Sequence, residues 1–349
     1  MLAHAFKKII ITKMNNRIVY HKEALPKILE DAFDAPELLR LGGVGMHCGC
    51  EYTSFPIFKN LLPYSRREHS YGVMAIVYHF THDIKMSLSG AFHDISTPCF
   101  SHSIDFLHKD FCNQEYTEGD TKRVIENSNF IQNLLKMAEI DQNDVNDYHL
   151  YPIADNDSPK LSADRLEYTC SNIVNFGFAS KEETQGLYDN LKVAKNEFGE
   201  DELCFDSFAK ARRFADLALR NSKIYICKED RFSMFALSSL LEKAIEQNII
   251  DESNLMKEEP TLIRKLSANS KSKKWWDEFR KLNCLFENET ADQNHFYIPA
   301  KKRFVDPFVI GVGRLSSIDG EFQNEVQSFL NLGFTPNLGH PSFFKTLSE

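Results

Sequence analysis

The chain has 349 residues, of which 42% are hydrophobic and 26% are charged, and its 50 acidic and 41 basic residues leave a formal net charge of −9. This balance is typical of a globular protein with a large core, and the acidic excess argues against a nucleic-acid-coating surface. The eight cysteines are scattered, which favours reduced thiols over a disulfide framework. The apolar runs are too short to span a membrane, so we expect a soluble cytoplasmic protein.

The first part of the sequence predicts a short hairpin followed by helices. Two apolar runs flank Asn15 and Asn16, which favours a hairpin over residues 7–20. Apolar side chains then recur with helical spacing over residues 25–41, and the glycine-rich segment 42–45 predicts a loop. Further helices are expected over residues 66–83 and 85–95, from residue 101 onward, and over residues 120–137.

The second part of the sequence predicts more helices, followed by a C-terminal part with strands. The acidic segment 143–159 contains two prolines and is expected to be an exposed connection. Ser162 is a suitable cap for the next helix, which places Asp164 in its first turn. Helices follow over residues 181–194, 203–221, 231–247 and 260–279, and strands are expected over 295–298 and 303–312.

These elements predict a mainly α protein with a small C-terminal α+β part. We expect a helical domain over residues 1–250, which includes the short N-terminal hairpin, and a C-terminal subdomain of helices and strands over residues 251–349.

Four side chains on separate segments form a candidate metal site. His93 and Asp94 are adjacent at the expected end of a helix that Pro98 stops, so both reach one ion only if it lies over that helix end. His69 and Asp164 would complete a set of two imidazoles and two carboxylates, which suits Mn, Fe, Ni, Co or Zn. Because the chain has 12 histidines, this pattern alone is a loose one.

Three motifs make the pattern more specific. They read Y-S-R-R-E-H-S-Y-G at residues 64–72, A-F-H-D-I-S-T-P-C-F-S-H at 91–102, and S-A-D-R-L-E-Y at 162–168. In this order they resemble the HD-domain metal-dependent phosphohydrolases, and most closely the branch with the deoxynucleoside triphosphate triphosphohydrolases. The resemblance covers roughly residues 40–250. It implies a helical-bundle core, a homo-oligomer and a divalent metal held by His69, His93, Asp94 and Asp164.

The resemblance also assigns residues to the substrate and the chemistry. It implies that Arg66 approaches a substrate phosphate and that Tyr168 packs against the sugar, and Arg67 and Arg165 are further candidates to offset phosphate charge. The family often has a second histidine where this chain has Thr97, and its histidine–glutamate pair has no counterpart in the segment 115–120. His102, or Glu118 in that segment, is therefore the candidate for proton transfer.

The leading hypothesis is hydrolysis of a phosphate ester or anhydride, most directly of a (deoxy)nucleoside triphosphate, by metal-activated water, with Mg joining the substrate as a further possibility. One alternative is a metal-stabilised nucleotide sensor or interaction module that has lost catalysis, because the accessory histidines are missing. Another is a phosphodiesterase. These readings differ in whether turnover occurs and in whether phosphate, triphosphate or a mononucleotide is released.

Two other motifs allow more than one interpretation. The segment His47-Cys48-Gly49-Cys50 could bind metal or be redox-active, but it has no second Cys or His pair at suitable spacing, which favours a tight loop near the entrance of the site. The segment Lys301-Lys302-Arg303 could hold the phosphate of a substrate or effector, or it could be an ordinary charged strand edge.

Overall fold

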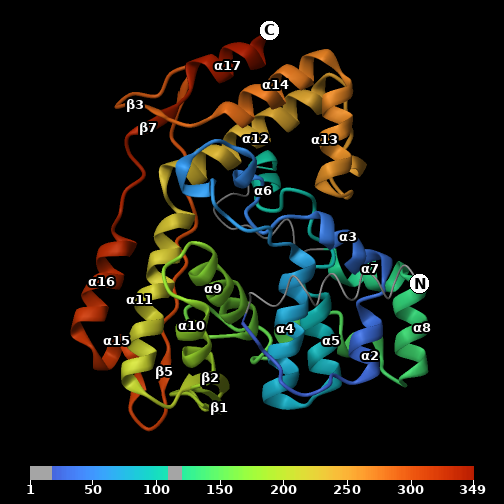
Figure 1. The fold of residues 1–349 in the computed structure, drawn as a ribbon, viewed down its shortest axis with the longest axis vertical. Coiled ribbons are helices and arrows are strands. Elements are labelled where there is room, and N and C mark those ends of the chain that lie inside the picture. Colours follow the sequence, from blue (N-terminus) through green and yellow to red (C-terminus); the bar gives the residue numbers. More distant parts are fainter. Residues whose placement is uncertain (1–17, 109–119) are drawn as a thin grey trace.

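Helices dominate the computed structural model, which describes residues 18–108 and 120–349 (Figure 1). The mainly α class is therefore confirmed. The helices are α2 (Lys27–Ala32), α3 (Pro36–Arg40), α4 (Arg66–Thr81), α5 (Ile84–Phe92), α6 (Ser103–Leu107), α7 (Thr121–Asn127), α8 (Asn129–Met137), α9 (Ala163–Asn175), α10 (Lys181–Tyr188), α11 (Phe208–Tyr225), α12 (Lys228–Glu246), α13 (Glu259–Ala268), α14 (Ser270–Lys281), α15 (Leu315–Ile318), α16 (Gly320–Leu330) and α17 (Pro341–Ser348). Most of the hairpin expected over residues 7–20, and all of the segment that contains Glu118, lie outside the described residues.

The strands form two small sheets. One has the order β1-β2-β5-β6 and the other the order β3-β7-β4. Their bounds are β1 (Leu191–Lys195), β2 (Asp201–Phe205), β3 (Phe286–Asn288), β4 (His295–Phe296), β5 (Phe308–Val309), β6 (Gly313–Arg314) and β7 (Asn337–Gly339). The parallel pairing of Phe205 in β2 with Val309 in β5 joins segments about a hundred residues apart.

Three helices predicted as continuous are each divided in two. The helix expected over residues 25–41 breaks before Pro36, because proline has no N–H to donate and holds Ala35 in an extended conformation. Ser128 separates α7 from α8, and Asn269 separates α13 from α14. Both are extended residues whose side chains accept backbone N–H groups of the following helix, so each acts as a new N-cap.

The β1–β2 hairpin was predicted as parts of two helices. The helix expected over residues 181–194 ends at Tyr188, and the one expected over residues 203–221 begins only at Phe208. Between them Leu191 pairs with Phe205 in an antiparallel ladder, and Leu203, Cys204 and Phe205 are fully buried. A short apolar run that is buried on both faces does not show the period of a strand, which is why the helical interpretation was wrong here.

The segment 143–159 is not the exposed connection that was expected. It contains two short 3-10 turns, and Val145, Ile153 and Ala154 are buried. Ile153 and Ala154 accept hydrogen bonds from the backbone N–H groups of Ala163 and Asp164, so this segment packs against the start of α9. The segment expected as a strand over residues 303–312 is mostly irregular chain, with β5 limited to two residues.

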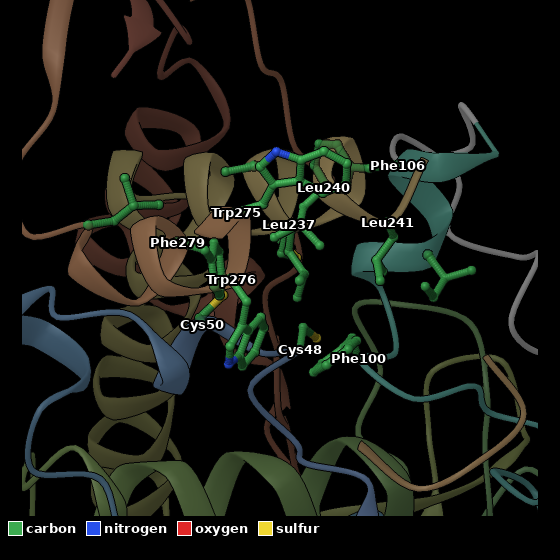
Figure 2. Packing of buried hydrophobic residues seen from close by; sticks show 14 of the residues in the cluster. Cys48, Cys50, Phe100, Phe106, Leu237, Leu240, Leu241, Trp275, Trp276 and Phe279 are labelled. Atoms are coloured by element: carbon green, nitrogen blue, oxygen red, sulfur yellow. The ribbon is translucent and has the colours of Figure 1, made fainter. Parts of the chain in front are cut away.

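Two of the hydrophobic cores contain residues of the segments that carry the three motifs. In one, α4 packs between α5 and α9, and residues such as Val73, Ile76 and Leu166 are buried there (Figure 1). The other joins the loop 48–58 and α6 to α12 and α14, where Trp275, Leu237 and Phe100 lie together (Figure 2). None of the helices in the described part of the chain is both long and apolar enough to cross a membrane.

Candidate metal centre and its cavity

His69 is presented by the first turn of α4. Ser65 starts this helix through a capping box, in which its hydroxyl accepts the N–H of Glu68 and the Glu68 carboxylate accepts the N–H of Ser65. His69 therefore lies on a fixed turn, and its side chain is 1% exposed. Gly72 lies one turn further along, and a Cβ there would come within 2.5 Å of Glu167 Cγ, so glycine permits α4 and α9 to approach closely.

His93 and Asp94 lie just beyond α5, not in its last turn as expected. The helix ends at Phe92, and His93 is its C-cap. The turn that follows is held by Arg40, which donates through Nη2 to the carbonyl oxygens of Ile95 and Thr97 at 3.0 and 2.7 Å. Both His93 and Asp94 are 6% exposed.

Asp164 lies in the first turn of α9, as the sequence predicted. The Ser162 hydroxyl accepts the N–H of Arg165 and caps the helix. The side chain of Asp164 is 25% exposed and is thus the most accessible of the four candidate ligands.

The four candidate ligands converge. His69 Nε2 lies 3.1 Å from His93 Nε2, 3.0 Å from Asp164 Oδ1 and 3.9 Å from Asp94 Oδ2. His93 Nε2 lies 3.6 Å from both carboxylates. Neighbouring ligands on an ion with bonds of about 2.1 Å stand roughly 3 to 3.5 Å apart, so these separations fit a shared cation. Within the described residues, His69, His93 and Asp94 form the one compact group of this kind.

Residues behind the histidines orient the nitrogen atoms. His69 Nδ1 lies 2.6 Å from Glu167 Oε2, and His93 Nδ1 lies 2.7 Å from the carbonyl oxygen of Gly90. With a cation bound, the Nδ1–H of each ring would donate to these acceptors and the Nε2 lone pair would be directed at the shared point. This donor set fits a divalent metal with mixed nitrogen and oxygen ligands.

The electrostatics of the cluster favour a positive charge. Burial lowers the pKa of His69, but its hydrogen bonds to Asp164 and Glu167 outweigh burial and raise the pKa to about 10. Burial raises the pKa of Asp94, but the Arg66 charge holds it well below its usual range. The pKa of Asp164 is likewise held low, by the two histidines against the effect of burial. Both carboxylates are therefore ionised at neutral pH and stabilise a cation between them.

Each oxygen of Asp94 has a partner of its own. Arg66 Nη1 donates to Asp94 Oδ2 at 2.7 Å, and the Thr97 hydroxyl donates to Asp94 Oδ1 at 3.0 Å. Arg66 also donates through Nε to the Ser101 hydroxyl at 3.1 Å. Thr97, which stands where the resembling family often has a histidine, thus orients a candidate ligand.

His102 and Asp105 form a pair near the cluster. His102 Nδ1 lies 2.8 Å from Asp105 Oδ2, and Asp105 is fully buried. Burial lowers the pKa of His102, so the ring is neutral at physiological pH. With Nδ1–H donated to Asp105, Nε2 is the nitrogen that can accept a proton.

The cluster opens into a cavity of about 710 Å³. Its wall includes His102, Arg66, Arg165 and Tyr168, so the structure brings these predicted site residues together with the candidate ligands. The ring of Tyr168 lies 6.4 Å from that of His69, and burial raises the pKa of its hydroxyl to about 12.

Two of the predicted phosphate-binding arginines are occupied elsewhere. Arg67 does not line the cavity, and it donates through Nη2 to the carbonyl oxygen of Phe33 at 2.7 Å, which corrects its assignment to the substrate. Arg165 lines the cavity, but its guanidinium donates to the Lys160 carbonyl oxygen at 2.7 Å and pairs with Asp155 at 3.1 Å. It therefore shapes the wall around Asp164.

The segment 47–50 forms a loop that contributes to the wall of the cavity. Cys48 lines the cavity but is buried in the core with Cys50, and burial raises the pKa of the Cys48 thiol to about 12 (Figure 2). Such thiols are unreactive at neutral pH. The ring of His47 faces the cavity, where its Nε2 lies 3.3 Å from Asn172 Oδ1.

Sequence reasoning missed several residues of the site. Glu167 was quoted within a motif without a role, although its spacing of three residues from Asp164 places both on one face of α9. Asp105 likewise follows His102 by three residues. No sequence pattern linked Tyr148 and Tyr225 to the site, because they reach the cavity from segments outside the motifs.

No family model matches the chain. The chain is 22% identical over 294 residues to YdhJ of Bacillus subtilis, which covers 84% of this chain and 87% of the relative. It is 26% identical over 214 residues to the metal-dependent phosphohydrolase cns2 of Cordyceps militaris, which covers 59% of this chain and 56% of that relative.

Two solved structures are similar in fold. A protein of Aquifex aeolicus superposes with a TM-score of 0.54 at 21% identity, covering 76% of this chain and 75% of that one. A phosphohydrolase of Bacteroides thetaiotaomicron superposes with a TM-score of 0.51 at 15% identity, covering 78% and 76%. The chain thus shares the fold of these two proteins.

Proposed function

We propose that this protein is an HD-type metal-dependent phosphohydrolase that acts on a nucleotide, most directly a (deoxy)nucleoside triphosphate. The likeness to a metal-dependent phosphohydrolase and to a structure named phosphohydrolase supports the reaction class. The observation that carries the proposal is the convergence of His69, His93, Asp94 and Asp164 at one end of a large cavity.

In this proposal the four ligands would hold one divalent metal, which would supply Lewis acidity toward a phosphoryl oxygen and increase the acidity of the attacking water. Arg66 lines the cavity beside Asp94, where its guanidinium offsets the charge of the phosphate under attack. Tyr168 provides an aromatic wall for the sugar.

His102 is the candidate for proton transfer. Its neutral ring accepts a proton at Nε2 from the attacking water, while Asp105 holds the other nitrogen and stabilises the imidazolium. A bond forms from the water oxygen to phosphorus, the bond from phosphorus to the leaving oxygen breaks, and the proton passes to that leaving oxygen.

The test is to purify the protein, measure its metal content, and screen nucleotides and phosphodiesters with each divalent metal for release of phosphate, triphosphate or mononucleotide. We expect turnover that a chelator abolishes, and we expect Asp94→Ala to lose both metal and activity. The absence of turnover over the whole panel would overturn the enzyme proposal. Metal retained by Asp94→Ala would show that the ligand set is wrong.

The same assay separates the alternatives. Thr97 stands in place of a histidine of the resembling family, which favours a nucleotide-binding module without catalysis as the second candidate. Tight nucleotide binding without hydrolysis would support that candidate, and release of a mononucleotide from a dinucleotide would indicate a phosphodiesterase.

A further inference from the structure

The segment between β4 and β5 brings three basic residues, Lys301, Lys302 and Arg303, to the cavity of the candidate metal centre. Lys301 and Arg303 both line this cavity, although they lie well over a hundred residues after the last of the motifs. They are in irregular chain, and β5 begins only at Phe308, so the alternative of a charged strand edge does not describe them.

This segment is held firmly in place. Between the two residues, Lys302 donates through Nζ to the carbonyl oxygens of Leu330 and Leu332, both at 2.5 Å, at the end of α16. Further along, the N–H of Asp306 donates to the Pro159 carbonyl oxygen at 2.9 Å, and the carboxylate of Asp306 accepts the hydroxyl of Ser316 at 2.5 Å. The basic residues are therefore presented by an anchored segment, which lowers the entropic cost of binding an anion.

Arg303 lines the same cavity as the groups proposed for chemistry. Burial lowers the pKa of His102, and the charge of Arg303 adds to this effect, as does that of Arg66. The charge of Arg303 also acts on the hydroxyls of Tyr168 and Tyr225, which line the same cavity. His102 thus experiences one cation beside the candidate ligands and a second from the C-terminal segment.

Besides Asp94 and Asp164, several acidic residues line the cavity, and two of them are paired with other cations. Asp155 pairs with Arg165 at 3.1 Å, and Glu200 pairs with Lys160 at 2.8 Å. Burial raises the pKa of Asp230 to about 8, so this carboxyl is protonated at neutral pH. Asp157, on the rim, is 98% exposed and its charge is screened by water.

We propose that Lys301 and Arg303 bind a second phosphate group of the substrate while the first lies at the His/Asp cluster. The site would then take phosphoric anhydrides or bisphosphates in preference to compounds with one phosphate. This inference rests on the proposed function. A cavity of about 710 Å³ is large for one phosphate, and arginine and lysine are the usual partners of a second one.

The experiment compares pyrophosphate with orthophosphate as ligands of the metal-loaded protein. Binding is measured by titration calorimetry, and the protein-bound metal is determined afterwards to exclude its extraction by pyrophosphate. A second measurement is the inhibition by each anion of the turnover of whichever substrate the nucleotide screen identifies. We expect pyrophosphate to bind at least about tenfold more tightly than orthophosphate. Arg303→Gln and Lys301→Gln should each reduce this advantage several-fold and leave the affinity for orthophosphate nearly unchanged.

Arg220→Gln is the matched control, because Arg220 is an exposed arginine of α11 that does not line the cavity. It should leave both affinities unchanged. Equal affinities for the two anions, or a pyrophosphate advantage that survives Arg303→Gln and Lys301→Gln together, would overturn the inference even if the protein hydrolyses nucleotides. Tight, Arg303-dependent pyrophosphate binding without any hydrolysis would uphold the second subsite and reject the proposed reaction.

Discussion

Glu167 shows at the level of single residues how the candidate ligands are held. It is 1% exposed, it accepts His69 Nδ1–H at 2.6 Å and the Ser171 hydroxyl at 2.8 Å, and it also accepts the hydroxyl of Tyr64. None of these contacts reaches the cavity, yet they determine which nitrogen of His69 faces the other ligands. Residues of this kind contribute to metal affinity through the ligand that they orient.

We expect Glu167→Gln to lower the affinity for the divalent metal by about 10- to 100-fold, because the amide is a weaker acceptor for His69 Nδ1–H. Competition with a chromogenic chelator measures this affinity. Ser171→Ala removes an outer hydrogen bond of Glu167 and a 3.4 Å contact with the Tyr20 hydroxyl, and it should change the affinity by less than about threefold. Unaltered metal binding in Glu167→Gln would mean that Glu167 does not orient the ligand.

Asp105 should set the pH dependence of turnover through His102. Burial lowers the pKa of His102, whereas its hydrogen bond to Asp105 raises it, so Asp105→Asn should lower the pKa further. A base must be neutral to accept a proton, and the acidic limb of the kcat/KM profile should therefore move to lower pH, with a plateau reduced about tenfold or more.

Arg303→Gln should shift the acidic limb of the kcat/KM profile in the opposite direction, to higher pH, because removing the positive charge raises the pKa of His102. Profiles of kcat/KM from pH 5 to 9 for the three proteins test both shifts. Identical limbs in all three would exclude His102 as the titrating base.

At the level of elements, the buried Glu259 and the half-buried Glu51 join the loop before α4 to the start of α13. Glu259 accepts the N–H of Gly45 at 2.8 Å and the hydroxyl of Tyr52 at 2.8 Å. Glu51 lies against it, and Glu51 Oε2 is buried without a hydrogen-bond partner among the described residues. Burial, with the charge of Glu259, raises the pKa of Glu51 from 4.5 to about 8.

This pair should make the fold less stable as pH rises. Because the pKa of Glu51 is higher in the folded than in the unfolded chain, the folded chain binds the proton more tightly, and stability falls between about pH 4.5 and pH 8. Glu51→Gln keeps the size and removes the titration, so it should stabilise the fold by about 1–3 kcal/mol at pH 7.5 and have little effect below pH 4.5. Urea unfolding at both pH values measures the difference, which a constant offset between the two proteins would contradict.

At the level of the whole molecule, the C-terminal part shares its core with the rest of the chain. Phe100 and Leu237, from before residue 250, pack in one cluster with Trp275 and Phe279 from after it (Figure 2). The parallel contact of β2 with β5 adds a second connection. The division at residue 250, which was proposed where the sequence pattern changes from helical to strand-containing, thus passes through a continuous core.

We expect the full chain to unfold in one cooperative transition, because separating the two parts would expose this shared core. Fragment 1–250 should expose the face of α12 that contacts α14, and it should aggregate or lack a sharp transition. Calorimetry of the full chain and solubility of the fragment test this. Two separate transitions, or a folded fragment, would instead support two independent domains.

The sequence predicted the parts of the site that depend on local chemistry. Helical spacing and the cap at Ser162 were sufficient to place Asp164 in the first turn of α9, and Pro98 indicated that the helix before it would end near His93. The mainly α class also followed from the apolar period. These features involve residues a few positions apart, where geometry is set by the backbone itself.

Only the tertiary structure decided which distant groups share the cavity. Arg67 follows Arg66 directly, but the turn of α4 directs it to the carbonyl oxygen of Phe33, about 100° away from its neighbour. Lys301 and Arg303 reach the candidate metal centre because α16 and the turn at Pro159 anchor their segment. Such contacts between distant residues depend on how helices and sheets pack over the whole chain, and no local periodicity in the sequence encodes them.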